Sequence, residues 1–85
     1  MTYSIFAKGK LTKEHCKIAD KEIKSGMIEH AYDDVISFHD LNADDVKPAQ
    51  EIMKRFGFDV ETEVYEEHYD GCFCELVEIK SDERR

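Results

Sequence analysis

Thiol and imidazole groups gather in one stretch of the sequence, residues 61–79 (ETEVYEEHYDGCFCELVEI). One residue separates Cys72 from Cys74, and His68 precedes them. Cysteine and histidine are the usual zinc ligands, but structural zinc sites normally show C-x2-C or H-x3-H spacings. On one strand these cysteines would lie ~6.5 Å apart, too far for a disulfide, whose Cβ atoms lie ~3.5–4.5 Å apart. With Cys16 the count is odd, so we expect free thiols and assign no metal or cofactor. The alternative is a small metal-binding module that uses the Cys and His residues of this segment.

Catalytic motifs are absent from the sequence. It contains no nucleophile elbow, no phosphate-cradling glycine loop, no H-E-x-x-H and no nucleotide-binding fingerprint. The four histidines are scattered along the chain, and no spacing pairs a cysteine with a histidine as nucleophile and base. We therefore expect a protein that is not an enzyme and has no catalytic residues.

Carboxylates recur at alternate positions just before the cysteines. Asp59, Glu61 and Glu63 would stand ~6.7 Å apart along one face of a strand, and Glu67 continues the row. Such a row resembles the charge ladder of a nucleic-acid strand, so it could occupy and block the basic groove of a nucleic-acid-binding protein. Two tyrosines in the same row are aromatic anchors of the kind that interfaces favour. Three acids further upstream, Glu29, Asp33 and Asp34, would extend this patch. The predicted partner-binding residues are therefore Asp59, Glu61, Glu63, Tyr65, Glu67, Tyr69, Glu29, Asp33 and Asp34.

The charge balance limits the classes of partner. The net charge is −8, which disfavours direct binding to nucleic acid because phosphates require Lys and Arg. Residues 1–28 hold six Lys and three acids, whereas residues 29–85 hold six Lys or Arg and seventeen acids. This asymmetry would speed encounters with a basic partner. The alternative is that the acidity only keeps a small protein soluble.

These features favour a non-catalytic, acidic protein-binding module that engages or inhibits a basic, nucleic-acid-handling protein. No apolar run approaches the ~18 residues of a membrane span, and the N-terminus lacks the pattern of a secretory signal. We therefore expect a cytoplasmic protein without a membrane partner, of a size and charge that suit viral or mobile-element inhibitors. A further alternative is a self-associating homodimer, formed by a basic first helix on an acidic hairpin or by pairing of sheet edges.

Periodicity predicts the elements that position these residues. The segment TYSIFAKG alternates as a strand does and ends at Gly9. Thr12 is placed to cap a helix over residues 13–24. A later helix starts near residue 44, because Pro48 is tolerated only in the first turn.

Residues 27–40 (MIEHAYDDVISFHD) fit two patterns. They match the i, i+3, i+4, i+7 template of a helix, which we favour, but VISF can instead form a short strand with Ile36 and Phe38 on one face. The helix choice predicts an α+β domain over residues 1-80. Its three-stranded, mainly antiparallel sheet (the N-terminal strand plus a C-terminal β-hairpin) is packed on one face by two or three helices. The strand choice predicts a four-stranded β-α-β-α-β-β order. Residues 81-85 form a frayed charged tail.

The register of the hairpin decides which side chains share a face. Asp70-Gly71 favours a two-residue type I′ turn, which sets Glu66 opposite Glu75 and Val64 opposite Val77. A three-residue loop would instead bring His68, Glu66 and the two cysteines to one face. We favour the first register, which leaves the acidic, tyrosine-bearing face exposed. Its predicted buried face is Phe58, Val60, Thr62, Val64, Phe73, Val77 and Ile79.

Overall fold

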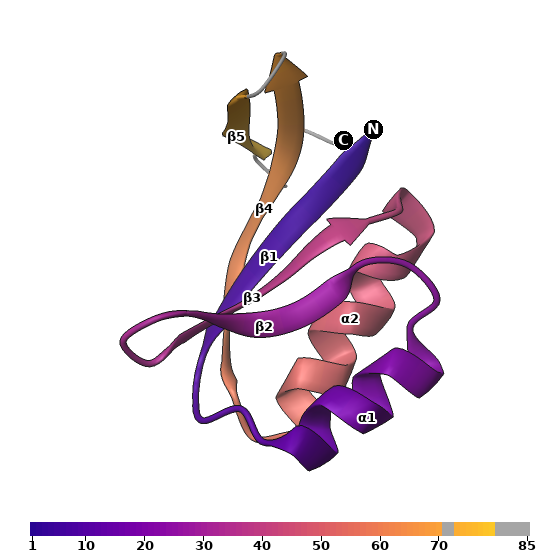
Figure 1. The fold of residues 1–85 in the computed structure, drawn as a ribbon, viewed down its shortest axis with the longest axis vertical. Helices are drawn as coiled ribbons and strands as arrows, with labels where there is room; N and C mark the ends of the chain where they lie inside the picture. The colour runs from indigo at the N-terminus through magenta and orange to yellow at the C-terminus, as the bar shows by residue number, and fades with distance from the viewer. Residues whose placement is uncertain (71–72, 80–85) are drawn as a thin grey trace.

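A five-stranded antiparallel sheet with two helices on one face forms the protein (Figure 1). This computed structural model describes residues 1–70 and 73–79. The strand order across the sheet is β2-β3-β1-β4-β5, the split β-α-β-β-α-β arrangement of ferredoxin-like domains with β5 added at one edge. Along the chain the elements are β1 (Thr2–Lys8), α1 (Lys13–Glu22), β2 (Met27–Tyr32), β3 (Val35–Leu41), α2 (Ala43–Arg55), β4 (Asp59–Asp70) and β5 (Phe73–Ile79).

The predicted three-stranded sheet is wrong, and so is the four-stranded alternative, because residues 27–41 form a hairpin of two strands. Asp33 turns the chain with φ 46°, and β3 then buries Ile36 and Phe38 in the core. In β2 the exposed positions outnumber the buried ones, and Ile28 is its one buried side chain. This edge strand therefore carries almost no alternation of apolar and polar residues. The backbone of β3 holds it in place, so the helical period misled the prediction.

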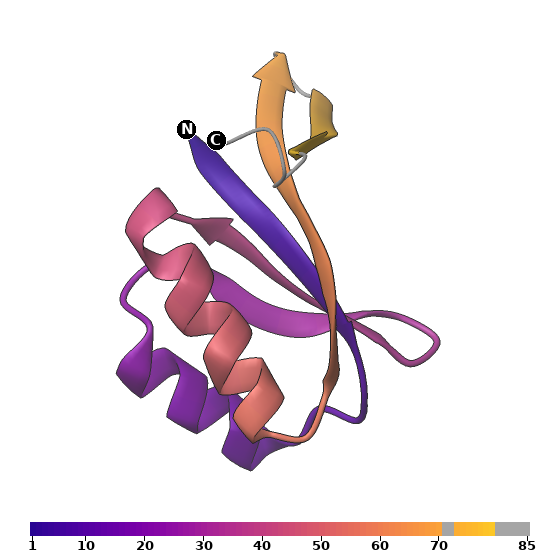
Figure 2. The same cartoon turned by 180° about the vertical axis from the view of Figure 1, so that it is seen from behind.

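The helix-covered face holds the hydrophobic core. Ile5 and Ala7 of β1 are fully buried, as are Ala49 and Met53 of α2. The view from behind shows both helices on this same face (Figure 2). The opposite face carries no helix in the described structure, and we call it the open face.

The helices predicted over residues 13–24 and from near residue 44 are present, with local differences. Thr12 caps α1 as expected, since its Oγ1 accepts a hydrogen bond from the His15 backbone N–H at 3.2 Å. α2 begins at Ala43, so Pro48 lies inside the helix rather than in its first turn. The side chain of Asn42 makes no capping bond. Asp45 instead accepts from the backbone N–H of Ser25 at 3.0 Å and from its hydroxyl at 2.6 Å, which ties α2 to the segment before β2.

The β4–β5 register differs from both predicted registers. Asp70 pairs with Phe73 and Val64 with Ile79, a shift of two residues from the favoured pairing. A shift of two keeps every side chain on its predicted face but changes its partner, so Glu66 lies opposite Val77 and the like-charge clash disappears. The predicted turn residue Gly71, Cys72 and the 81–85 tail lie outside the described residues.

The predicted buried face of the hairpin is only partly buried. Phe58 is in the core, and Val60, Val64 and Ile79 are half-buried, but Thr62 is exposed and Val77 is 41% exposed. The reason is visible in Figure 1, where the end of β4 and all of β5 extend beyond the helices. The side chain of Phe73 lies outside the described residues.

Two aromatic residues of the β2–β3 hairpin test the corrected fold. Phe38 is 1% exposed and Tyr32 is 62% exposed, whereas a helix over this segment would bury both on one stripe. Phe38→Ala should lower the free energy of unfolding by about 3–5 kcal/mol, and Tyr32→Ala by less than about 1 kcal/mol. Urea denaturation measures both, and equal losses would contradict the hairpin.

Candidate functional site

The open face gathers side chains from all five strands. Directly paired residues of antiparallel strands share a face, so the register places Ser4 beside Tyr65, Phe6 beside Ser37, and Ser37 beside Glu29. At the other edge, Glu67 pairs with Leu76 and Tyr69 with Cys74. His39 joins them through its bond to Glu29.

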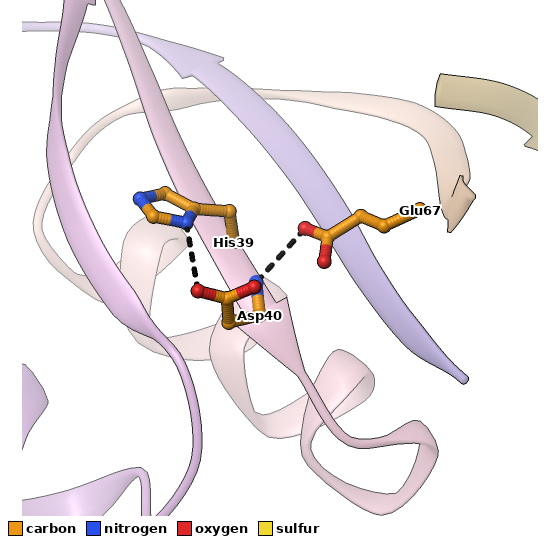
Figure 3. A group of neighbouring side chains, drawn as sticks. All are labelled: His39, Asp40 and Glu67. Carbon is orange, nitrogen blue, oxygen red and sulfur yellow. Dashed lines mark hydrogen bonds and ion pairs between the residues drawn. The ribbon is translucent and has the colours of Figure 1, made fainter. Parts of the chain in front are cut away.

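Glu67 lies on β4, opposite Thr2 at the start of β1, and is 4% exposed. Its Oε1 accepts hydrogen bonds from the Thr2 hydroxyl at 2.5 Å and from the Tyr69 hydroxyl at 3.3 Å. Its Oε2 accepts from the Ser4 hydroxyl and from the backbone N–H of Asp40 at 2.9 Å. Figure 3 shows the carboxylate pointing at the Asp40 backbone nitrogen. Three hydrogen bonds and the longer Tyr69 contact occupy both carboxylate oxygens and join β4 to β3 across β1.

These bonds keep Glu67 ionised. Burial raises the pKa of this carboxyl, but the donors from Asp40, Ser4 and Thr2 stabilise the anion, and the pKa lies below its ordinary value of 4.5. The Tyr69 hydroxyl has one proton, which it shares between Asp40 Oδ1 at 3.0 Å and the more distant Glu67 Oε1. The bond to Asp40, with burial and the nearby charges, raises the pKa of Tyr69. The result is a fixed negative charge surrounded by neutral donors.

A backbone irregularity makes this geometry available. The β1–β3 pairing shifts its register between Tyr3 and Ile5, and Asp40 has φ 61°. Such left-handed values are uncommon outside glycine, but aspartate tolerates them better than most residues. The bulge turns the Asp40 N–H out of the ladder and toward Glu67.

His39 sits beside the network between two carboxylates. Its Nε2 lies 2.6 Å from Glu29 Oε2, and its Nδ1 lies 3.4 Å from Asp40 Oδ2. Ligand atoms of His39, Asp40 and Glu67 lie within 4.8 Å of one another (Figure 3). A cation there would have to displace the hydrogen bonds that already fill Glu67, so this cluster is better described as a hydrogen-bond network than as a metal centre.

The thiol–histidine set of the metal alternative is separated by the strand register. Cys74 is exposed on the open face opposite Tyr69. His68 pairs with Glu75 on the other face and contacts Glu66 Oε1 at 3.0 Å. Cys72 lies outside the described residues.

The predicted partner-binding residues do not all lie together in the structure. Burial raises the pKa of the Tyr65 hydroxyl, and the nearby charges of Glu61, Glu78 and Glu63 raise it further. Tyr69 and Glu29 also border the open face. Glu67 lies on the open face as predicted but is buried there rather than exposed.

The remaining predicted residues lie near the other end of the sheet. Asp59 pairs with Lys8, and Asp33 and Asp34 form the turn between β2 and β3. They do not extend the surface around Tyr69.

Several residues of the open face were not predicted from the sequence. Phe6 packs edge-on against Tyr65 with ring centroids 5.5 Å apart. His39, Asp40, Ser4 and Thr2 belong to or border the Glu67 network. A periodic pattern can place Phe6 on the outer face of a strand, but no spacing marks a bond between residues 2, 40 and 67.

Charge separates between the two layers of the fold. The two helices carry six basic and six acidic residues, whereas the five strands carry one lysine, Lys8, and ten acids. Within the described residues, the ion pair that involves Lys or Arg joins Arg55 to Glu22, both on helices. The acidic strand residues are Glu29, Asp40, Asp59, Glu61, Glu63, Glu66, Glu67, Asp70, Glu75 and Glu78.

Comparison with known proteins gives no relative: no family model, no curated protein and no solved structure matches this chain. Within the described part of the chain, neither helix has the length and apolarity needed to cross a membrane.

Replacing the central carboxylate tests the network. Glu67→Gln presents an amide N–H2 to hydroxyl and backbone donors and should lower the free energy of unfolding by about 1–3 kcal/mol. Glu75→Gln on exposed β5 should change it by less than about 0.5 kcal/mol. Equal values for the two variants in urea denaturation would contradict the network.

The same pair gives a pH test with a definite sign. Because the pKa of Glu67 is lowered by folding, its contribution is complete above the ordinary value of 4.5 and is lost as the pH falls through the folded pKa. The stability difference between wild type and Glu67→Gln should therefore shrink from about pH 6 to about pH 3. A difference that stays constant or grows would show that the carboxylate is not held ionised.

Proposed function

We propose that this protein is a non-catalytic module that binds a basic protein through the open face of its sheet. The observation that carries the proposal is the combination, on one face, of acids without Lys or Arg partners in the described residues and of aromatic side chains. Glu61, Glu63 and Glu29 supply charge, and Tyr65 and Tyr69 supply contact area.

The aromatic residues argue against a merely solvated face. Tyr69 is 62% and Leu76 is 42% exposed, and both lie beside carboxylates. Aromatic residues are enriched at protein interfaces, and Tyr is among the residues that dominate binding energy. The hydroxyl of Tyr69 takes part in the Glu67 network, but solubility alone gives no reason for its exposed ring or for Leu76.

The charge supports a protein partner rather than RNA. Domains with this split topology include RNA-binding modules whose open sheet stacks bases on aromatic residues. Fold alone does not carry function, and here the strands hold ten acids against Lys8. A phosphate backbone would be repelled, whereas a basic nucleic-acid-binding protein would be attracted.

The proposal includes a biological setting. A carboxylate-bearing face that occupies a groove built for phosphates would act as an inhibitor of its partner. Small acidic proteins of this kind suit viral or mobile genetic elements, and we place the proposed activity in the cytoplasm.

Charge reversal on the open face tests the proposal. The double variant Glu61→Lys, Glu63→Lys should lose the partner that wild-type protein captures from an extract of its native host. Capture by wild type should also weaken as salt rises from about 50 mM to about 500 mM, because screening shortens the reach of charge. Mass spectrometry identifies the retained protein, which should be basic.

The matched control places the same change of charge on the helices. Glu14→Lys, Glu51→Lys alters two exposed helical acids and should retain the partner. If both double variants lose the partner equally, the binding depends on net charge rather than on the open face, which contradicts the proposal. If the Glu61→Lys, Glu63→Lys variant still captures the partner, the proposal is overturned.

A further inference from the structure

The open face contains a hollow of about 380 Å³ that spans the sheet from β2 to β5. On the central strands it is lined by the small residues Ser4 and Ser37, which are 2% and 7% exposed. Glu29 borders it on the β2 side, and Leu76 and Tyr69 border it toward β5. The two serines leave room where larger side chains would fill the concave face.

A negative charge without a cation lies in this hollow. Glu67 lines it, and its pKa is lowered, so the carboxylate is ionised at neutral pH. Its four donors are neutral hydroxyl and amide groups. Among the described residues, no Lys or Arg lies within 4.0 Å of it. Buried carboxylates usually lie beside a cation.

The two sides of the hollow offer different chemistry. On one side, Glu29 contacts His39 through its Oε2, which leaves its Oε1 available to a donor among the described residues. On the other side, Phe6, Tyr69 and Leu76 present aromatic and aliphatic surface. A ligand that suits both sides is a cation with an apolar stem.

We infer that the hollow takes an arginine side chain of the basic partner, a refinement that rests on the proposed function. The methylene stem would lie on Leu76, and the guanidinium plane would stack near Phe6 or Tyr69. Its N–H groups would donate to Glu29 Oε1, while the charge of Glu67 acts through space. Arginine suits the site better than lysine because its planar, weakly hydrated head combines stacking with several donors.

An NMR titration of the full chain with N-acetylarginine amide tests this inference. We expect saturable shifts at Ser4, Ser37 and Leu76, with a dissociation constant on the order of 1 mM for so small a ligand. N-acetylcitrulline amide, which has the same shape without the charge, should produce no saturable shifts there. Shifts spread evenly over all acidic residues, or equal shifts with citrulline, would overturn the inference.

Matched variants locate the site on one face. Leu76→Ser should weaken arginine binding about tenfold, and so should Glu29→Gln. The controls are Val77→Ser and Glu75→Gln on the opposite face of β5, where Val77 is 41% exposed against 42% for Leu76. Both controls should bind as wild type does. Equal weakening by Leu76→Ser and Val77→Ser would overturn the site.

The two proposals can fail separately. If arginine binds saturably in the hollow but partner capture is unaffected by the charge reversal at Glu61 and Glu63, the arginine site is supported and the acidic-face function is overturned. Partner capture that depends on the acids, with no arginine binding, would overturn the hollow alone.

Discussion

The open face depends on one buried carboxylate. Glu67 reaches across β1 to the backbone of Asp40 and also accepts hydroxyl bonds from β1 and from Tyr69. Placing an anion at 4% exposure is costly unless every acceptor is satisfied, and here four donors satisfy it. The bond to Asp40 occurs together with the left-handed backbone of that residue and the register shift in β3, and the Tyr69 hydroxyl lies beside the same charge.

The fold explains why the acidity is concentrated on one layer. The sheet must bury one face under α1 and α2, and the helices carry balanced charges. The other face has no helix to cover it in the described structure, so its strands can hold carboxylates and aromatic side chains together. The acidic residues that are unevenly distributed along the sequence thus lie mainly on the sheet, whereas the helices on its other face carry balanced charge. Such an acidic layer suits binding to a basic surface.

The sequence predicted the features that local patterns determine. The capping residue Thr12, the two helices and the face of each β4 side chain followed from spacing, and a register error of two residues left those faces unchanged. The failures came from long-range pairing. Strand β2 has little pattern of its own and is held by pairing with β3, so the helical period of residues 27–40 predicts a helix where two strands form.

The candidate site was predictable only in part for the same reason. Alternation placed Glu61, Glu63 and Tyr65 on one face, but it also placed Glu67 there as an exposed acid. Nothing local distinguishes Glu67 from Glu63. Only the meeting of residues 4, 40 and 67 in space separates a buried structural charge from an exposed one.

The central claim is that negative potential is concentrated on the open face of the sheet. The direct measurement compares NMR relaxation caused by cationic and anionic paramagnetic cosolutes in the same protein. The cation should enhance relaxation at Phe6, Ser37 and Tyr65 far more than the anion does, with little difference at the exposed side of α1. The same ratio on both faces would contradict the claim.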